Sequence, residues 1–369
     1  MKVAIYHSFM DNIGGAEIVS LTLARELGAD IYTTNISAEQ ITKMGFGDVI
    51  PRIISIAKVP KMAPFRHQLT LFTFRFFKPK KKYDYHIISG DWAMGAVVRN
   101  TPNMWYVHSP LNELWEFKSY IKKKVISSWK IIPYELFVMV NRFLTRRYAR
   151  SVDKWVCNSH NTQNRIKKYY SQKATIIYPP IQTSHKAKST FGNYWLSVNR
   201  LIKHKQIELQ LKAFQKIPDE RLVIVGSYEK GTAQFEQYKR YLESIQPSNV
   251  SIKHWVDNAE LDKLYANCKG FITTAKNEDF GMTPLEAMSY GKSVVANNEG
   301  GYKESIIQKK TGILIDRITP DKIRDAVQKI NENPSRYQKA CLVQAKSFDT
   351  REFIKKIRNE IQLCETLNK

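Results

Sequence analysis

The chain has 369 residues, of which 43% are hydrophobic and 25% are charged, a composition typical of globular proteins and sufficient for two domain cores. Its four cysteines lack the spacing of a zinc site or a disulfide framework, which favours a reducing compartment such as the cytosol. No run of about 18 apolar residues is present, and the N-terminus reaches polar residues too early for a signal peptide, so we expect no membrane-spanning helix.

The positive charge of the chain is concentrated in one part. The formal net charge is +24, and residues 51–200 contain 27 Lys and Arg against 6 Asp and Glu. Residues 1–50 are net acidic, and residues 201–369 carry only a small basic excess. Charge that served solubility alone would be spread evenly, so the concentration indicates a polyanionic partner, either an anionic membrane surface or nucleic acid.

The N-terminal sequence predicts a strand, a glycine-containing loop and a helix. Residues 2–6 are a short apolar run suited to a buried parallel strand. The loop contains residues 14–17 (Gly-Gly-Ala-Glu), and apolar residues at a spacing of four predict a helix over residues 16–27, ended by Gly28. A glycine pair at this point allows a ligand to approach the backbone, although the geometry of the turn alone also explains it.

Six further strand-like runs alternate with helical stretches in the first half, at residues 30–33, 52–56, 85–89, 104–108, 154–158 and 175–178. This alternation predicts a parallel sheet with helices on both faces. Ligands bind at the carboxyl ends of the strands in such sheets. Asp91, His108 and Ser109 lie at such ends and are therefore candidate site residues.

Two segments of the first half are both basic and aromatic. Residues 61–82 combine four phenylalanines over 72–77 with a Lys-Pro-Lys-Lys-Lys run, and residues 115–150 combine two tryptophans with several Lys and Arg. Such mixed faces suit a membrane interface. Interleaved aromatics also suit stacking on single-stranded nucleic acid, and a solvated basic face over core aromatics is a third interpretation. We favour an anionic membrane surface as the partner of residues 61–150 and do not expect nucleic acid.

The alternating pattern restarts after a polar stretch that ends near Thr190. Strand-like runs follow at residues 194–198, 221–225, 250–255, 270–274, 293–296 and 312–315, with helical stretches between them. A second parallel α/β domain is the natural inference. We therefore expect a first domain over residues 1–185, a second over 190–347, and a final amphipathic helix over 348–369.

Residues 277–288 are the most informative stretch, because they follow a strand and open a short helix. A helix N-terminus presents free N–H groups and the positive end of the helix dipole, which suits phosphate. Glu278 and Glu286 would repel an anion but accept hydrogen bonds from hydroxyls, and a nucleotide sugar satisfies both demands. The structural alternative is that residues 283–286 (Thr-Pro-Leu-Glu) are a capping box with Pro at the first helical position.

Other strands of the second half end in residues that suit the same ligand. Arg200 and Lys205 lie in one strand-to-helix loop, where two cations can clamp a diphosphate and stabilise charge on a leaving phosphate. Gly226 allows close approach after a second strand, and Val256 follows a third, where backbone groups could hold a base. Each signal alone is modest, because Arg and Lys in loops are usually only solvated, but their order along the chain is specific.

With this order of residues the chain resembles the retaining family-4 glycosyltransferases of the GT-B fold. The core of the resemblance is the Glu-x7-Glu motif that joins Glu278 to Glu286, and residues 14–17 match the loop after the first strand. Residues 106–110 (Tyr-Val-His-Ser-Pro) are similar to those of bacterial and archaeal mannosyl- or rhamnosyltransferases. The Arg that usually follows soon after the His-Ser-Pro motif is absent, and residues 112–113 (Asn-Glu) stand near its place.

The resemblance implies two Rossmann-like domains that face each other across a cleft, with the acceptor held by the first, the donor held by the second, and the final helix crossing back to the first. The catalytic residues that it implies are His108, Glu278, Arg200 and Lys205. The donor-binding residues that it implies are Gly15, Arg200, Lys205, Gly226, Val256, Glu278, Phe280, Gly281, Met282, Thr283 and Glu286. The acceptor-side candidates are Glu17, Asp91 and Ser109.

The implied reaction moves a hexose, with retention of configuration, from a nucleotide sugar to a glycan or lipid-linked glycan at the cytoplasmic face of the membrane. Mannose from GDP-mannose is the first expectation. The alternatives are a UDP-sugar-dependent transferase of the same fold and a GT-B nucleotide-sugar epimerase. No metal is expected, because fixed cations and a helix N-terminus can stabilise the leaving diphosphate and no Asp-x-Asp motif is present.

Overall fold

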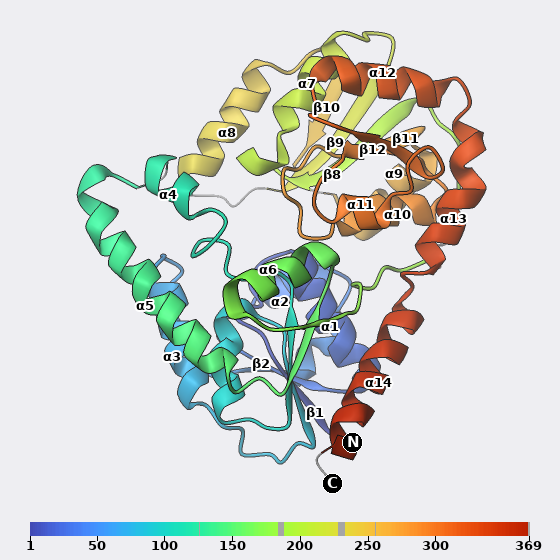
Figure 1. Cartoon of the computed structure of the whole chain (residues 1–369). Helices are drawn as coiled ribbons and strands as arrows, with labels where there is room; N and C mark the ends of the chain where they lie inside the picture. Colours follow the sequence, from blue (N-terminus) through green and yellow to red (C-terminus); the bar gives the residue numbers. More distant parts are fainter. Residues whose placement is uncertain (125, 184–187, 228–232, 255, 368–369) are drawn as a thin grey trace. The chain divides into compact units, whose positions relative to one another are not determined.

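The computed structural model describes residues 1–124, 126–183, 188–227, 233–254 and 256–367. The chain divides into two compact units, of which unit 1 combines residues 1–178 with 353–369 and unit 2 comprises residues 179–352. Each unit is built on its own parallel sheet (Figure 1). In the described part of the chain, no helix is both long enough and apolar enough to cross a membrane.

Unit 1 contains a seven-stranded parallel sheet with the order β3-β2-β1-β4-β5-β6-β7. Its strands are β1 (Val3–Tyr6), β2 (Asp30–Thr33), β3 (Ile53–Ser55), β4 (Tyr85–Ile88), β5 (Asn103–Val107), β6 (Lys154–Cys157) and β7 (Thr175–Ile176). Each overlaps one of the seven predicted runs, and only β5 extends beyond its run, by one residue at Asn103. β1, β4 and β5 are buried along their whole length, as expected of strands that helices cover on both faces.

The helices of unit 1 surround this sheet. They are α1 (Gly15–Leu27), α2 (Ala38–Lys43), η1 (Gly47–Arg52), α3 (Phe65–Phe76), η2 (Asp91–Val98), α4 (Lys118–Lys124), η3 (Ser128–Lys130), α5 (Ile131–Ala149) and α6 (His160–Tyr170). The predicted end of α1 is confirmed, since Gly28 adopts a left-handed φ of 62° and its N–H bonds to the carbonyl of Ala24. Its strand and loop place the N-terminus of α1 at the carboxyl edge of the sheet.

The aromatic residues of the two basic segments divide between core and surface. Phe74 is fully buried, and Trp115 stacks on Tyr169 with ring centroids 4.4 Å apart. The guanidinium of Arg142 lies 4.3 Å from the centre of the Trp115 ring, so part of the basic and aromatic pattern is internal packing. Other aromatic residues, Phe72 and Phe76 among them, are exposed.

Helix α14 (Thr350–Leu367) spans the limit between the units, and its residues from Phe353 onward pack on unit 1. The Phe353 ring meets Tyr106 edge-on at 5.9 Å, and Ile357 and Ile361 are fully buried. Lys154 forms an ion pair of 2.6 Å with Glu360.

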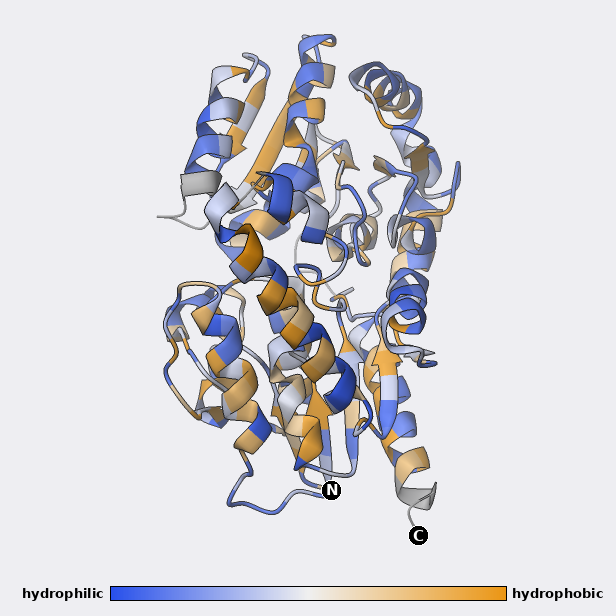
Figure 2. Ribbon diagram, turned by 60° about the vertical axis from the view of Figure 1, so that its left-hand side comes forward, coloured by the Kyte–Doolittle hydropathy of each residue, from blue (hydrophilic) through white to orange (hydrophobic). Residues whose placement is uncertain are grey.

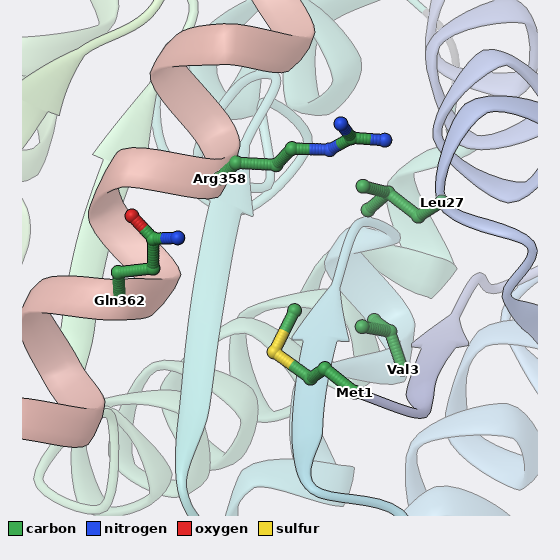
Figure 3. Close-up of a pocket in the computed structure, with 5 residues that line it drawn as sticks. All are labelled: Met1, Val3, Leu27, Arg358 and Gln362. Atoms are coloured by element: carbon green, nitrogen blue, oxygen red, sulfur yellow. The ribbon is translucent and has the colours of Figure 1, made fainter.

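The outer side of the same helix borders a small pocket. Arg358 and Gln362 face Met1, Val3 and Leu27 across a pocket of about 280 Å³ (Figure 3). Arg358 also donates a hydrogen bond of 3.1 Å to the carbonyl of Glu26, at the end of α1. These contacts attach the end of the chain to the first strand and helix of unit 1.

Unit 2 contains a six-stranded parallel sheet with the order β10-β9-β8-β11-β12-β13. Its strands are β8 (Tyr194–Arg200), β9 (Arg221–Ser227), β10 (Val250–Lys253), β11 (Gly270–Ile272), β12 (Val294–Asn297) and β13 (Gly312–Ile315). Its helices are η4 (Lys203–Lys205), α7 (Ile207–Gln215), α8 (Ala233–Ser244), α9 (Asn258–Asn267), α10 (Met282–Ser289), α11 (Tyr302–Ser305), α12 (Pro320–Asn331), η5 (Pro334–Tyr337) and α13 (Gln338–Lys346).

The strand order of unit 2 positions the site. β8 and β11 are neighbours in the sheet although β9 and β10 separate them in the chain. Because the strands are parallel, the loops after β8 and β11 leave the same edge next to each other. The third strand ends at Lys253, two residues earlier than the sequence predicted, and Trp255 lies outside the described residues.

Candidate active site

The loops after β8 and β11 bring Lys205 and Glu278 together, as the strand order requires. The ammonium of Lys205 donates a 2.6 Å hydrogen bond to Oε2 of Glu278, and the two side chains are only 13% and 19% exposed. The backbone holds the two loops in register: the N–H of Lys276 donates to the carbonyl of His204 at 2.8 Å, and the Thr274 hydroxyl donates to the carbonyl of Lys205 at 2.7 Å.

Neighbouring charges decide the protonation of this pair. Burial alone would raise the pKa of Glu278, but the charge and hydrogen bond of Lys205, with smaller effects of His204 and Arg200, hold it below its usual value. Glu278 is therefore a carboxylate at neutral pH. Burial, reinforced by the charge of Lys205, lowers the pKa of His204 to about 4, so this imidazole is neutral. Arg200 ends β8 with an exposed side chain.

The turn between Glu278 and α10 depends on a glycine. Gly281 has a φ of 86°, and a Cβ placed there would lie 2.4 Å from Cε1 of Tyr302. The hydroxyl of Tyr302 is hydrogen-bonded to the hydroxyl of Thr273 at 2.7 Å, which fixes the ring against the turn. The N–H of Gly301 donates to the carbonyl of Glu278 at 2.9 Å, so a second loop also holds the backbone of Glu278.

The predicted capping box at the start of α10 is wrong. α10 begins at Met282 with Gly281 as its N-cap, and no side chain caps it. Thr283 and Pro284 therefore lie within the first turn, because the left-handed Gly281 takes the position that the pattern assigned to Thr283. The helix itself supplies no carbonyl partner to the N–H groups of this first turn, so these groups can donate to a ligand.

Glu286 has a different partner from the one that a capping box would supply. Its Oε2 accepts a 2.8 Å hydrogen bond from the hydroxyl of Tyr265 in α9. The Tyr265 ring stacks on Tyr290, with centroids 5.7 Å apart and planes at 7°. Burial raises the pKa of Glu286, and the hydrogen bond from Tyr265 opposes that rise. The side chain is therefore oriented from outside its own helix.

The remaining donor candidates differ in what they can offer a ligand. The Phe280 side chain is buried and packs on Phe348 at 5.7 Å, which leaves only its backbone for recognition. A Cβ on Gly226 would lie 2.4 Å from Cδ2 of Leu201, so packing already explains this glycine. Val256 is buried, while Met282 and Thr283 are half-buried at the start of α10.

In unit 1, a chain of hydrogen bonds links His108 to the first strand. Nε2 of His108 lies 2.9 Å from the hydroxyl of Ser89, which lies 2.7 Å from the hydroxyl of Ser20. The Ser20 hydroxyl lies 2.9 Å from Nδ1 of His7, and Nε2 of His7 lies 3.8 Å from the carboxylate of Glu17. Strand ends β1, β4 and β5 and helix α1 each contribute one or two members of this chain.

The proton positions in this chain of hydrogen bonds can be assigned by counting donors. The Ser20 hydroxyl bonds the carbonyl of Ala16 at 2.9 Å, and since a carbonyl only accepts, its single proton is used there. Ser89 and His7 must then donate to Ser20, and His108 must donate to Ser89 through Nε2–H. Burial, with the nearby His7, lowers the pKa of His108 to about 3. His108 is therefore neutral, with Nδ1 as its acceptor nitrogen.

His108 and Glu17 line a pocket of about 260 Å³ at the same edge of the sheet. The pocket is also lined by Asp91 and Glu113 and by Trp92, whose ring N–H donates to Glu113 at 3.0 Å. Carboxylates and a ring face of this kind suit sugar hydroxyls and C–H groups. Ser109 is not among the lining residues, since it is buried and its hydroxyl bonds the carbonyl of Pro110 at 3.3 Å. Gly15 is exposed at the first turn of α1.

Several residues of this arrangement were not predicted from the sequence. His7 follows β1 as His108 follows β5, so the same strand-end rule would have found it. Ser20 and Tyr265 lie on helices at positions with no distinctive pattern. Their roles come from the packing of these helices against strands that are distant in the sequence.

Two family profiles divide the chain between them. Residues 13–185 match the profile described as Glycosyltransferase Family 4, and residues 181–346 match the one described as Glycosyl transferases group 1. The chain is 27% identical to the alpha-1,3/1,6-mannosyltransferase ALG2 of Dictyostelium discoideum over 90% of each chain. It is 26% identical to ALG2 of Candida glabrata over 56% of this chain and 53% of that one.

Solved structures share the architecture at lower identity. Anabaena Alr3699/HepE, in a complex with UDP-glucose, has a TM-score of 0.74 and 15% identity over 98% of this chain and 99% of its own. Sucrose-phosphate synthase of Thermosynechococcus elongatus has a TM-score of 0.76 and 14% identity over 99% of both chains. The two parallel-sheet units are thus those of the GT-B fold, as the sequence predicted.

Proposed function

Because the chain belongs to the family 4, group 1 glycosyltransferases, we propose that it transfers a hexose from a nucleotide sugar to a hydroxyl of a glycan, with retention of configuration. The observation that carries this proposal is the Lys205–Glu278 pair beside the N-terminus of α10. It combines a cation, a carboxylate and helix N–H groups within one pair of neighbouring loops. These are the groups that a diphosphate joined to a sugar requires.

The chemistry follows from where charge develops. As the bond between the anomeric carbon and the phosphate oxygen breaks, negative charge grows on the diphosphate and positive charge on the sugar ring. Lys205, Arg200 and the first N–H groups of α10 would stabilise the diphosphate, and Glu278 would bind sugar hydroxyls. The acceptor hydroxyl attacks the anomeric carbon from the face that the diphosphate leaves, and its proton passes to the departing phosphate oxygen. The roles of Gly15 and His108 stay predictions.

Mannose from GDP-mannose is the donor that we propose, and the names of relatives support it. The ALG2 proteins are named alpha-1,3/1,6-mannosyltransferases, and a mouse relative 28% identical over 50% of this chain is named a GDP-Man:Man(3)GlcNAc(2)-PP-Dol alpha-1,2-mannosyltransferase. A UDP-sugar is the alternative donor, since Alr3699/HepE was crystallised with UDP-glucose. The name of the mouse relative also supports a lipid-linked glycan as the acceptor.

We further propose that the enzyme needs no metal and works as a peripheral protein at the cytoplasmic face of a membrane. Lys205 and Arg200 supply the positive charge that a metal would otherwise bring to a diphosphate. The concentration of basic residues between 51 and 200 suits an anionic lipid surface. Transfer that continues in EDTA would support metal independence, and loss restored by Mg²⁺ would contradict it.

The decisive experiment measures transfer from GDP-mannose, UDP-glucose and UDP-GlcNAc to a lipid-linked oligosaccharide, with a thermal-shift measurement for each donor. A bound donor raises the melting temperature by mass action, so binding is measured apart from transfer. We expect the largest shift and the fastest transfer with GDP-mannose. Product formed from a donor without any acceptor would favour an epimerase. No shift with any nucleotide sugar would overturn the proposal.

A further inference from the structure

Two helices of unit 1 expose continuous apolar stripes. On α3 the exposed large apolar residues recur at intervals of three and four, and their exposed fractions lie between 45% and 59%: Phe65, Leu69, Phe72 and Phe76. On α5 the exposed large apolar residues are also spaced by three or four positions, except that two of them are adjacent, and they are 42% to 81% exposed: Ile132, Leu136, Met139, Val140 and Phe143. These nine residues are called the α3–α5 surface below. Figure 2 shows the apolar residues along the ribbon of α5.

The stripes are additional to the faces that hold both helices in the fold. Leu71 and Phe74 of α3 and Val138 and Tyr148 of α5 are buried in one hydrophobic core. The guanidinium of Arg75 lies 5.8 Å from the centre of the Tyr148 ring, which joins the two helices. Each helix is therefore apolar on two faces, and only one of them is used by unit 1. A helix that served only the core would have a polar outer face.

Lys and Arg far outnumber Asp and Glu in the two segments that contain the α3–α5 surface. Residues 58–82 contain eight Lys and Arg and no Asp or Glu; Asp11 pairs with Lys61 and Arg66, and Asp30 pairs with Lys81. Residues 118–150 contain nine Lys and Arg and a single acidic residue, Glu135. Two cations neutralise that carboxylate, since Lys118 and Lys122 lie 2.7 Å and 2.9 Å from it. Trp129, which is 75% exposed, lies beside α5 with the ammonium of Lys130 4.7 Å from its ring.

We propose that the α3–α5 surface inserts shallowly into an anionic lipid bilayer, with the surrounding cations on the lipid head groups. Apolar stripes rimmed by Lys and Arg, with an interfacial tryptophan, match such a surface. A second copy of the chain fits less well, because a two-fold interface would bring two positive surfaces together. Nucleic acid fits the cations but not Leu69, Leu136 or Met139, which offer no ring for a base to stack on.

The inner side of α3 borders the pocket that contains His108, and the inner side of α5 packs on Trp92, which lines that pocket. His67, between Phe65 and Leu69 of α3, stacks on Trp92 with centroids 4.7 Å apart and planes at 3°. Phe137 of α5 lies against the same tryptophan at 6.3 Å. Insertion of the outer faces therefore brings the pocket of unit 1 close to the lipid head groups. This part of the inference rests on the proposed function, because the route from the bilayer to the pocket would be used by a lipid-linked acceptor.

The test uses the full chain and vesicles of phosphatidylglycerol and phosphatidylcholine in a 3:7 ratio, with pure phosphatidylcholine for comparison. We expect binding to the anionic vesicles that weakens with salt. In Phe72→Ser/Phe143→Ser, removal of two large apolar side chains should lower the partition coefficient roughly 100-fold, about tenfold per residue. The matched control is Val343→Ser on α13, which is 63% exposed like Phe143 and should bind as the wild type does.

The same variants separate this inference from the proposed function. Phe72→Ser/Phe143→Ser should keep its melting temperature, its donor-induced shift and transfer to a water-soluble glycan, and lose transfer to the vesicle-bound acceptor. Unchanged vesicle binding by this variant would overturn the inference. A wild-type dimer in solution that the substitutions dissociate, or RNA binding that they abolish, would also overturn it. A donor-induced shift that is absent from the wild type contradicts only the proposed function.

Discussion

The pairing of Lys205 with Glu278 is the residue-scale feature on which donor binding depends. Each side chain compensates the charge of the other in an environment that is largely closed to water. An incoming diphosphate would attract Lys205, and sugar hydroxyls would then occupy the oxygens of Glu278. The pair therefore keeps Glu278 ionised and the two groups close together until the ligand replaces their mutual contact.

Substitution of Lys205 by alanine should lower kcat/KM for transfer by about 10²–10³-fold, the effect of losing one group that stabilises developing charge. The control is Lys203→Ala, which removes an exposed lysine from the same turn and should leave kcat/KM within a factor of two or so. Steady-state kinetics with saturating acceptor would measure both. Equal losses in the two variants would mean that local net charge, and not the contact with Glu278, is what matters.

Ser20 is a positioning residue, since it acts on His108 through Ser89. Ser20→Ala leaves the donors of Ser89 and His7 without their acceptor, which should cost about 1–3 kcal/mol of unfolding free energy. Thr22→Ala is the matched control, because Thr22 also bonds the carbonyl four residues earlier, at 2.8 Å, on the same helix. Urea unfolding would measure both.

A purely structural role predicts that Ser20→Ala changes stability alone. A positioning role predicts in addition a lower kcat with an altered pH profile, since His108 is no longer confined to one tautomer. Restoration of kcat by Ser20→Thr would support positioning.

At the scale of elements, the turn into α10 is held by two other segments of the chain. Tyr302 and Gly301 at the start of α11 contact it, and Thr273, the residue after β11, holds the Tyr302 ring in place. The N-terminus of α10 is thereby held at one position relative to Glu278. This is the preorganisation that charge stabilisation needs, because dipoles already in place require no rearrangement when the reaction occurs.

Gly281→Ala should destabilise unit 2 and abolish the donor-induced thermal shift. An alanine at a φ of 86° carries a conformational penalty of about 1–2 kcal/mol, and its Cβ would meet the Tyr302 ring. Tyr302→Ala in the same chain should recover only part of the loss, since it removes the contact but not the strained backbone. Gly47→Ala is the control, because its nearest neighbour would be 3.6 Å away. Full recovery in the double variant would contradict the role of backbone strain.

At the scale of the whole molecule, burial of neutral histidines makes stability depend on pH. The pKa values of His86 and His204 are lowered to about 4, and that of His108 to about 3, with burial as the largest cause. Between these values and the unfolded value of about 6.5, the unfolded chain binds protons that the folded chain does not. The free energy of unfolding therefore falls as the pH is lowered through this range.

His204→Gln should reduce the slope of the unfolding free energy against pH by about 1.4 kcal/mol per pH unit between pH 5 and pH 6. The reason is that the variant lacks the one proton that only the unfolded chain binds at His204. Urea unfolding of the wild type and the variant at several pH values would measure it. His160→Gln replaces an exposed histidine at the start of α6 and should leave the slope unchanged. A slope that is the same in all three proteins would mean that His204 titrates in the folded chain as it does in the unfolded one.

The sequence by itself determined the architecture and the chemical class of this protein. Every strand of unit 1 overlaps a predicted apolar run, and α1 ends before Gly28 as predicted, because buried strands and helix ends are encoded by neighbouring residues. The order of Arg200, Lys205, Glu278 and Glu286 resembles that of the glycosyltransferase family, and the first three lie at or just beyond the ends of β8 and β11.

Only the tertiary structure decided which of these residues meet. Lys205 and Glu278 are 73 positions apart, and Tyr265 reaches Glu286 from another helix, contacts that no local pattern encodes. The capping box failed for the same reason, since the conformation of Gly281 depends on the loops packed around it. The outer stripes of α3 and α5 could likewise not be told from core faces by spacing alone. Periodicity identifies an apolar face, but the packing of the chain decides whether protein, lipid or water lies against it.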